Sequence, residues 1–244
     1  MRLTKLSYSR MSCFLQCNLQ YRFKYHDKLE SLEPTPDYFE FGNFIHRLFE
    51  LYAKDGITIQ EAFTKAFEEY NKFGNKHKAC IREIVSNFLK FDNKLKKSDF
   101  VSQEFEEGFS LKFPNIETQM TGFIDRKLKL PDDKFIIVDY KTSKSELSKQ
   151  EAMSNHQLMT YSWVCSVNYD IDPKNILAGL FYARTGNSVF VSFDQKQINK
   201  FVSFCEKTCE TIHEMQPDNA KPNRNEYCYF CDYKSICPDF NKGK

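Results

Sequence analysis

Two short apolar runs in the middle of the chain end on charged residues, and they constrain the fold more than any other feature. Residues 136–138 read Ile-Ile-Val and lead directly to Asp139, Tyr140 and Lys141, and residues 122–124 lead to Asp125. Because alternate residues of a strand face the same side, Asp139 and Lys141 share one face. Burying such charges without partners is costly, so each charge needs a partner within the fold.

These charges suit one kind of chemistry. If Asp125 lies on a neighbouring antiparallel strand, two carboxylates converge beside the Lys141 ammonium group. Carboxylate oxygens bind hard divalent cations, and a nearby lysine can orient a water or add positive charge during phosphodiester hydrolysis. A salt bridge at the rim of a sheet explains the same residues, so the alternative stays open at this point.

Residues on two predicted helices bear on the choice between a metal site and a salt bridge. His46 lies within a helical pattern of apolar residues, where a histidine either is hydrogen-bonded in the core or binds a metal. Gln157 and Tyr161 are four residues apart, so they share a helix face and could present hydrogen-bond donors to phosphate groups.

The apolar pattern along the chain predicts the order of its elements. Helical spacing over residues 38–97 predicts three helices, and the residues after 100 alternate as strands do. The predicted strands are 105–113, 122–130 and 135–140, with a turn at residues 131–133, followed by a helix at 151–167, strands at 176–183 and 188–193, a helix at 198–215 and an irregular tail from 217. This order predicts an α/β fold, a mixed sheet flanked by helices with a helical N-terminal half, as one domain over residues 1–244.

Composition excludes several classes of protein. Hydrophobic residues make up 41% of the 244 residues, which is too many for a disordered chain. No apolar run is long enough to span a membrane, and no signal peptide is recognisable, so we expect a cytoplasmic protein without membrane contact. Lys and Arg total 35 against 33 Asp and Glu. A net charge of +2 does not indicate a nucleic-acid-binding protein, so any DNA-binding surface must be local.

Nine cysteines without a signal peptide favour metal binding over disulfides. Cys228, Cys231 and Cys237 have the spacing C-x2-C-x5-C, which brings three thiolates to one metal centre and leaves one ligand missing. Cys13 and Cys17, near the other end of the chain, are the candidates for the fourth. The remaining cysteines lie on predicted helices and are expected to be buried.

In their order along the chain, these residues resemble the PD-(D/E)XK nuclease superfamily, and within it the RecB-like branch of AddB-type and CRISPR-associated iron–sulfur exonucleases. That branch has a helix histidine, a G-x-x-D strand, a D/E-x-K strand and a Q-x-x-x-Y helix. The matching positions here are His46, residues 122–125, residues 139–141 and residues 157–161. No proline precedes Asp125, and the second acid is Asp rather than Glu; both variations are common in this branch.

The resemblance implies a restriction-endonuclease-like sheet and a site that binds Mg²⁺ or Mn²⁺. His46, Asp125, Asp139 and the backbone carbonyl of Tyr140 would be the ligands, and Lys141 would assist the attacking water. Glu104 looks like the acidic residue often found before the G-x-x-D strand, with a catalytic role. Gln157 and Tyr161 would contact DNA or brace the site.

The resemblance also implies that Cys17 joins Cys228, Cys231 and Cys237 in holding a [4Fe–4S] cluster. This module, formed by residues of about 13–25 and 217–240, would join the C-terminal segment to the N-terminus. Cys13 is the rival fourth ligand. A structural Zn²⁺ is the alternative to the cluster, because thiolates alone do not distinguish iron from zinc.

The expected function is a standalone metal-dependent DNA exonuclease acting on single-stranded ends, with 5′ to 3′ polarity by analogy. Repair, recombination, viral genome processing (in the host cytoplasm) and CRISPR spacer acquisition all reuse such a site, so neither the pathway nor a recombination, replication or CRISPR-adaptation partner is fixed. The oligomeric state is equally open. Two alternatives remain: a non-catalytic DNA-binding subunit with a structural cluster, and a structure-specific endonuclease.

Overall fold

The computed structural model describes residues 3–34 and 36–240. The chain divides into two compact units, each described here by itself. The first lies within residues 3–34, 110–122 and 202–240, and the second within residues 36–109 and 123–201. A single domain over the whole chain stays a prediction. Among the described residues, no helix is both long enough and apolar enough to cross a membrane.

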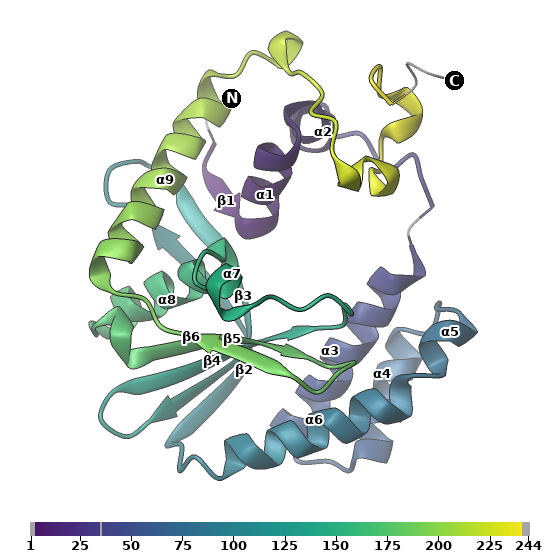
Figure 1. Ribbon diagram of the computed structural model, residues 1–244, viewed down its shortest axis with the longest axis vertical. Coiled ribbons are helices and arrows are strands. Elements are labelled where there is room, and N and C mark those ends of the chain that lie inside the picture. The colour runs from purple at the N-terminus through teal and green to yellow at the C-terminus, as the bar shows by residue number, and fades with distance from the viewer. Residues whose placement is uncertain (1–2, 35, 241–244) are drawn as a thin grey trace. The chain divides into compact units, whose positions relative to one another are not determined.

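The second unit is built on a mixed sheet (Figure 1). β3 runs antiparallel to β4, β4 parallel to β5, and β5 antiparallel to β6, while β2 pairs with the other side of β3. The strands are β2 (Ser102–Lys112), β3 (Gln119–Leu130), β4 (Lys134–Lys141), β5 (Ile176–Tyr182) and β6 (Ser188–Val191). Residues of β2 and β3 between 110 and 122 belong to the first unit.

β3 and β4 form the predicted hairpin. Leu130 is paired with Lys134, and the turn between them takes positive φ angles of 58° and 51° at Asp132 and Asp133. Aspartate tolerates this left-handed region better than most residues, because its short polar side chain can hydrogen-bond locally. The turn at residues 131–133 is therefore confirmed.

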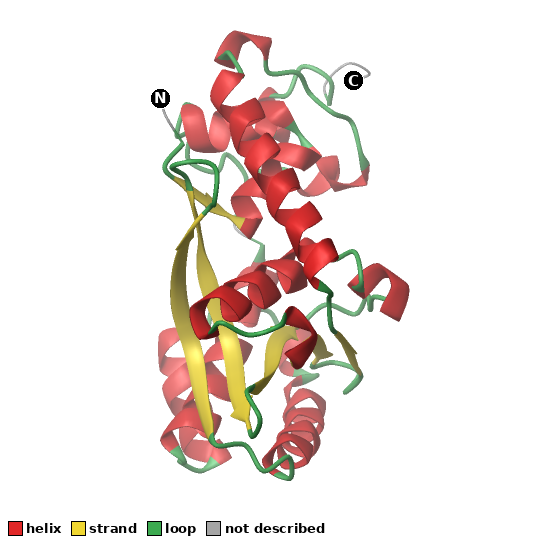
Figure 2. Cartoon of the chain, turned by 90° about the vertical axis from the view of Figure 1, so that its left-hand side faces the viewer, coloured by secondary structure: helices red, strands yellow, loops and turns green. Residues whose placement is uncertain are grey.

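Helices cover both faces of this sheet (Figures 1 and 2). On one face, Phe49 and Phe88 stack with ring centroids 3.8 Å apart, and both contact the buried ring of Tyr140. On the other face, Tyr161 reaches the neighbouring Asp139. On the first side, α3 (Asp37–Asp55), α4 (Ile59–Glu69) and α6 (Ile81–Lys96) share one apolar core with β3, β4 and β5, and the short α5 (Asn75–Lys78) precedes α6; the second face carries α8 (His156–Tyr169). The short α7 (Lys149–Ala152) precedes α8, and a 3₁₀ turn (Pro173–Asn175) follows it.

The first unit joins segments from both ends of the described chain. β1 (Lys5–Ser7) runs parallel to residues 119–121 of β3. Leu19 N donates to Lys221 O, and the Tyr233 hydroxyl donates to Leu29 O at 2.9 Å. The helices are α1 (Tyr8–Gln16), α2 (Asn18–Tyr21), a π-helix (Arg22–His26), the later part of α9 (Gln195–Glu214) and 3₁₀ turns at Pro217–Asn219, Glu226–Phe230 and Lys234–Ile236.

The predicted α/β class, with a mixed sheet flanked by helices, is confirmed. Most element bounds shift by a few residues, and two differences are larger. The region 38–97 holds an additional one-turn helix, α5, before α6. The helix predicted from residue 151 begins at His156, because the Asn155 side chain accepts hydrogen bonds from the backbone N–H groups of Gln157 and Leu158 and so caps a new helix there.

Candidate active site

Asp125, within β3, lies beside Asp139, near the end of β4. Arg126 is paired with Val138, so Asp125 and Asp139 occupy the next position along the antiparallel strands. Asp125 Oδ2 accepts a hydrogen bond of 2.7 Å from the backbone N–H of Tyr140. This bond fixes the Asp125 carboxylate against the strand that carries Asp139. Both carboxylates are buried.

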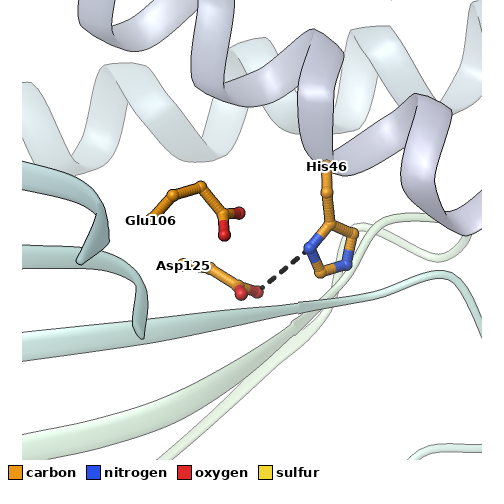
Figure 3. Close-up of side chains that lie close together, drawn as sticks. All are labelled: His46, Glu106 and Asp125. Atoms are coloured by element: carbon orange, nitrogen blue, oxygen red, sulfur yellow. Dashed lines mark ion pairs between the residues drawn. The ribbon is translucent and has the colours of Figure 1, made fainter. Parts of the chain in front are cut away.

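A histidine and a second acid join Asp125 (Figure 3). His46, on α3, lies with Nδ1 3.4 Å from Asp125 Oδ2. Glu106, on β2, points to the same place, and one ligand atom each of His46, Glu106 and Asp125 lies within 4.8 Å of the others. Oxygen ligands lie about 2.3–2.6 Å from Ca²⁺ and about 2.0–2.1 Å from Mg²⁺, so atoms this far apart can share one divalent cation. The residues therefore fit a metal ion.

Glu106 was missed in the sequence, where Glu104 was the acidic candidate. Glu104 instead lies in ion-pair contact with Lys127 at 2.8 Å, and Glu107 contacts the same ammonium group. Glu106 has a φ of 47°, a left-handed conformation inside a strand. Such a residue interrupts the alternation of a strand, as in a β-bulge, so residues 104 and 107 reach one partner while residue 106 reaches another. Nothing in a regular alternating pattern indicates that break.

Asp139 and Lys141 share a face, as expected, and form an ion pair at 2.8 Å. Two residues of α8 complete the arrangement. The Lys141 ammonium group donates to Gln157 Oε1 at 2.9 Å, Gln157 Nε2 donates to the Tyr161 hydroxyl at 2.8 Å, and that hydroxyl donates to Asp139 Oδ1 at 3.0 Å. These four side chains thus form a closed ring of polar contacts. Tyr140, between Asp139 and Lys141, turns its ring into the core against Phe49 and Phe88, and the same ring lies edge-on to the His46 ring, with centroids 6.1 Å apart.

Burial and the close approach of the carboxylates shift the pKa values of the site residues. Burial raises the pKa of Glu106 to about 7, and the Asp125 carboxylate adds to the rise. Burial also raises the pKa of Asp139, against the opposing effect of Lys141. Burial alone would lower the pKa of His46, but the carboxylates, Asp125 foremost, raise it to about 9. The group therefore favours a cation at its centre, whether a proton on His46 or a metal ion.

The first unit brings the predicted cysteine ligands to one cavity. Cys17, Cys228, Cys231 and Cys237 all line it. Asn223 ties the two chain segments together, because its backbone N–H donates to Cys17 Sγ at 3.4 Å and its side chain donates to Gln16 O at 3.0 Å. Within the described part of the chain, this lining includes Cys17 but not Cys13. The nine cysteines all lie in the described part of the chain, and none of them forms a disulfide.

Comparison with known families is decisive for the class of the protein. The family model of the PD-(D/E)XK nuclease superfamily matches residues 5–238. The chain belongs to this superfamily. Nucleases of the PD-(D/E)XK superfamily use divalent metal ions, and His46, Glu106 and Asp125 could hold one.

Its relatives include one subunit of an ATP-dependent helicase/deoxyribonuclease from Carboxydothermus hydrogenoformans, which is 30% identical over 75% of this chain and 20% of that protein. The protein of the same name from Streptococcus agalactiae is 26% identical over 73% of this chain and 18% of its own length. The chain thus spans about a fifth of these curated relatives. The solved structure of a predicted exonuclease from Eubacterium rectale has a TM-score of 0.56 and 12% identity, covering 94% of this chain and 87% of that one. This likeness concerns the fold.

Proposed function

We propose that this PD-(D/E)XK protein is a metal-dependent exonuclease that hydrolyses phosphodiester bonds of single-stranded DNA ends, with 5′ to 3′ polarity. The observation that carries the proposal is the convergence of His46, Glu106 and Asp125 beside the Asp139–Lys141 pair. A rim salt bridge alone accounts for Asp139 and Lys141, but it gives no reason for a histidine and two further carboxylates to gather there.

In this proposal, His46, Glu106, Asp125, Asp139 and the Tyr140 carbonyl hold Mg²⁺ or Mn²⁺. When bound, the ion supplies an activated water and stabilises charge on the phosphate. Lys141 contributes an ammonium group whose direction is set by Asp139 and Gln157, and it orients the attacking water. The contacts of Gln157 and Tyr161 support a bracing role, since both hydrogen-bond to residues of the site. Glu104 is the weaker catalytic candidate, because its carboxylate pairs with Lys127.

We further assign a [4Fe–4S] cluster to Cys17, Cys228, Cys231 and Cys237. Their shared cavity supports a common metal centre, and the Asn223 hydrogen bonds support a structural role in joining the segment around Cys17 to the segment that carries the other three cysteines. A single Zn²⁺ would use the same thiolates, and iron and acid-labile sulfide analysis of anaerobically purified protein separates the two.

The names of the relatives support DNA as the substrate and a protein partner. Each is a subunit of a helicase/deoxyribonuclease, and this chain corresponds to about a fifth of it. We therefore infer that the chain supplies nuclease activity to repair, recombination, replication or CRISPR-adaptation machinery. A non-catalytic DNA-binding subunit is the competing function, and the site carboxylates would then serve only the fold.

Digestion of single-stranded DNA labelled at either end, with Mn²⁺, tests the proposal. Wild-type protein should shorten the strand from its 5′ end, and Asp139→Ala should leave it intact. Closed circular single-stranded DNA should survive, whereas an endonuclease would cut it. Full activity in Asp139→Ala would refute the assignment of the site. Binding of DNA without any shortening, with or without metal, would favour the binding-subunit function.

A further inference from the structure

A groove runs along α3 from the candidate metal group. Its volume is about 600 Å³, within the range of roughly 300–1,000 Å³ that ligand-sized sites occupy. His46 and Glu106 line one part of it, and the aromatic residues Tyr38 and Phe39 line another. All of these residues belong to the second unit. A molecule that extends along this groove from the metal group on the side of Tyr38 and Phe39 would therefore contact the aromatic pair.

Tyr38 and Phe39 are more exposed than aromatic residues of the core. Phe39 is 55% exposed and Tyr38 39% exposed, and their ring centroids lie 4.7 Å apart at 35°. Phe39, Asn43 and His46 follow one another at helical spacing on the same side of α3. The rise from Phe39 to His46 is about 10 Å along the helix axis, a span of one to three nucleotides.

Between the rings and His46 the groove is lined by small and uncharged residues. Gly42 is one of them, and a Cβ at this position would be in ordinary van der Waals contact with Thr142 Oγ1, at 3.7 Å. Asn43 is exposed and presents an amide that can both donate and accept. An amide of this kind suits the edge of a nucleobase, whose donors and acceptors it can match.

The charges in the groove disfavour a phosphate chain along this path. In the described lining, Arg47 is the one Lys or Arg side chain. Its guanidinium group is held by Glu69 through contacts of 3.0 to 3.1 Å and by Glu50 at 2.8 Å. With its charge compensated in this way, Arg47 offers little attraction to phosphate, whereas a neutral base stacked on an aromatic ring needs no cation.

We propose that Tyr38 and Phe39 form a stacking platform for an unpaired base next to the scissile phosphate, and that this platform selects single-stranded over paired DNA ends. The inference rests on the proposed nuclease function. A base within a duplex is stacked on its neighbours and cannot lie on the rings without first being unpaired.

Phe39→Ala and Tyr38→Ala should raise KM for single-stranded DNA on the order of tenfold each, because one stacked base is lost, and leave kcat unchanged. Phe39→Trp keeps an aromatic ring at this position and should therefore keep the low KM of the wild-type protein. Val167→Ala, at an equally exposed position (51%) on α8, is the control and should change neither constant. A KM for Phe39→Ala equal to that of wild type would overturn the platform, as would a change in kcat alone.

A modified substrate identifies the contact itself. An abasic nucleotide moved stepwise from the 5′ end should raise KM for wild-type protein at one position and give no further rise in Phe39→Ala, since both changes remove the same interaction. Additive effects at every position would overturn the proposal.

A binding measurement separates this inference from the nuclease proposal. Single-stranded DNA carrying 2-aminopurine should lose fluorescence when its base stacks on the platform, and Phe39→Ala should abolish the loss. If wild-type protein cleaves no DNA yet gives this signal, the nuclease proposal fails, and with it the place beside a scissile phosphate, while base stacking on the aromatic pair stands. If it cleaves DNA without the signal, the platform fails and the nuclease proposal stands.

Discussion

The Tyr161 hydroxyl lies 3.0 Å from Asp139 Oδ1 and 2.8 Å from Gln157 Nε2. Through these contacts one turn of α8 holds both members of the Asp139–Lys141 pair, because Gln157 binds Lys141 and Tyr161 binds Asp139. Residues four apart on a helix share a face, which explains the spacing of the two. The Q-x-x-x-Y motif thus acts as a clamp across the end of β4.

Loss of the Tyr161 hydroxyl should reduce activity without unfolding the protein. In Tyr161→Phe the ring keeps its edge contact with Phe109, but Asp139 and Gln157 each lose a hydrogen bond. We expect kcat to fall by about 10- to 100-fold, as when outer-shell partners of metal ligands are removed. Tyr169→Phe, on the same helix but bonded to Lys127, should keep full activity. Equal kcat values for Tyr161→Phe and wild type would show that the clamp is dispensable.

Two neighbouring glutamates provide a matched test of the metal group. Glu106→Gln should raise the Mn²⁺ concentration for half-maximal activity on the order of tenfold, because a site loses affinity when it loses a charged oxygen ligand. Glu104→Gln should leave that concentration unchanged, since Lys127 keeps its contact with Glu107. A Mn²⁺ titration of both variants decides between them. If Glu104→Gln raised this Mn²⁺ concentration and Glu106→Gln did not, Glu104 and not Glu106 would be the residue that acts in catalysis.

The cysteines near the N-terminus can be distinguished in the same way. Cys17→Ser should lose iron and acid-labile sulfide, because Cys17 lines the cavity of the C-terminal cysteines. Cys13→Ser should retain both, because Cys13 does not line that cavity in the described part of the chain. Loss of iron only in Cys13→Ser would reverse the assignment, and zinc in place of iron in wild-type protein would replace the cluster with a single ion.

The sequence was most informative where local chemistry decides the outcome. The charges after residue 138 needed partners, and Lys141 indeed lies against Asp139. The turn at residues 131–133 followed from its aspartates. Glu106 could not be predicted, because the left-handed backbone at that residue breaks an otherwise regular alternation. Equally, the start of α8 depends on a single cap, Asn155, which a periodic pattern does not register.

A buried charge pair in the second unit has no signature in the sequence. Arg126 and Asp92 have fully buried side chains and lie 2.7 Å apart, with Gln103 and Lys96 as further partners. Arg126 stands in a strand pattern and Asp92 in a helix pattern, and neither pattern indicates that the two side chains meet. Their meeting depends on how α6 packs against β3, which is a tertiary event.

Substitutions in the Arg126–Asp92 pair are expected to affect stability rather than activity. Arg126→Met should lower the free energy of unfolding by about 3 kcal/mol, because it leaves the Asp92 carboxylate buried with only part of its compensation. Arg126→Met combined with Asp92→Leu should recover most of that loss, since two apolar side chains can replace a buried pair. Urea unfolding of the two single variants and the double variant gives the coupling directly. If the double variant is no more stable than Arg126→Met, the loss comes from packing around residue 126 and not from a stranded carboxylate.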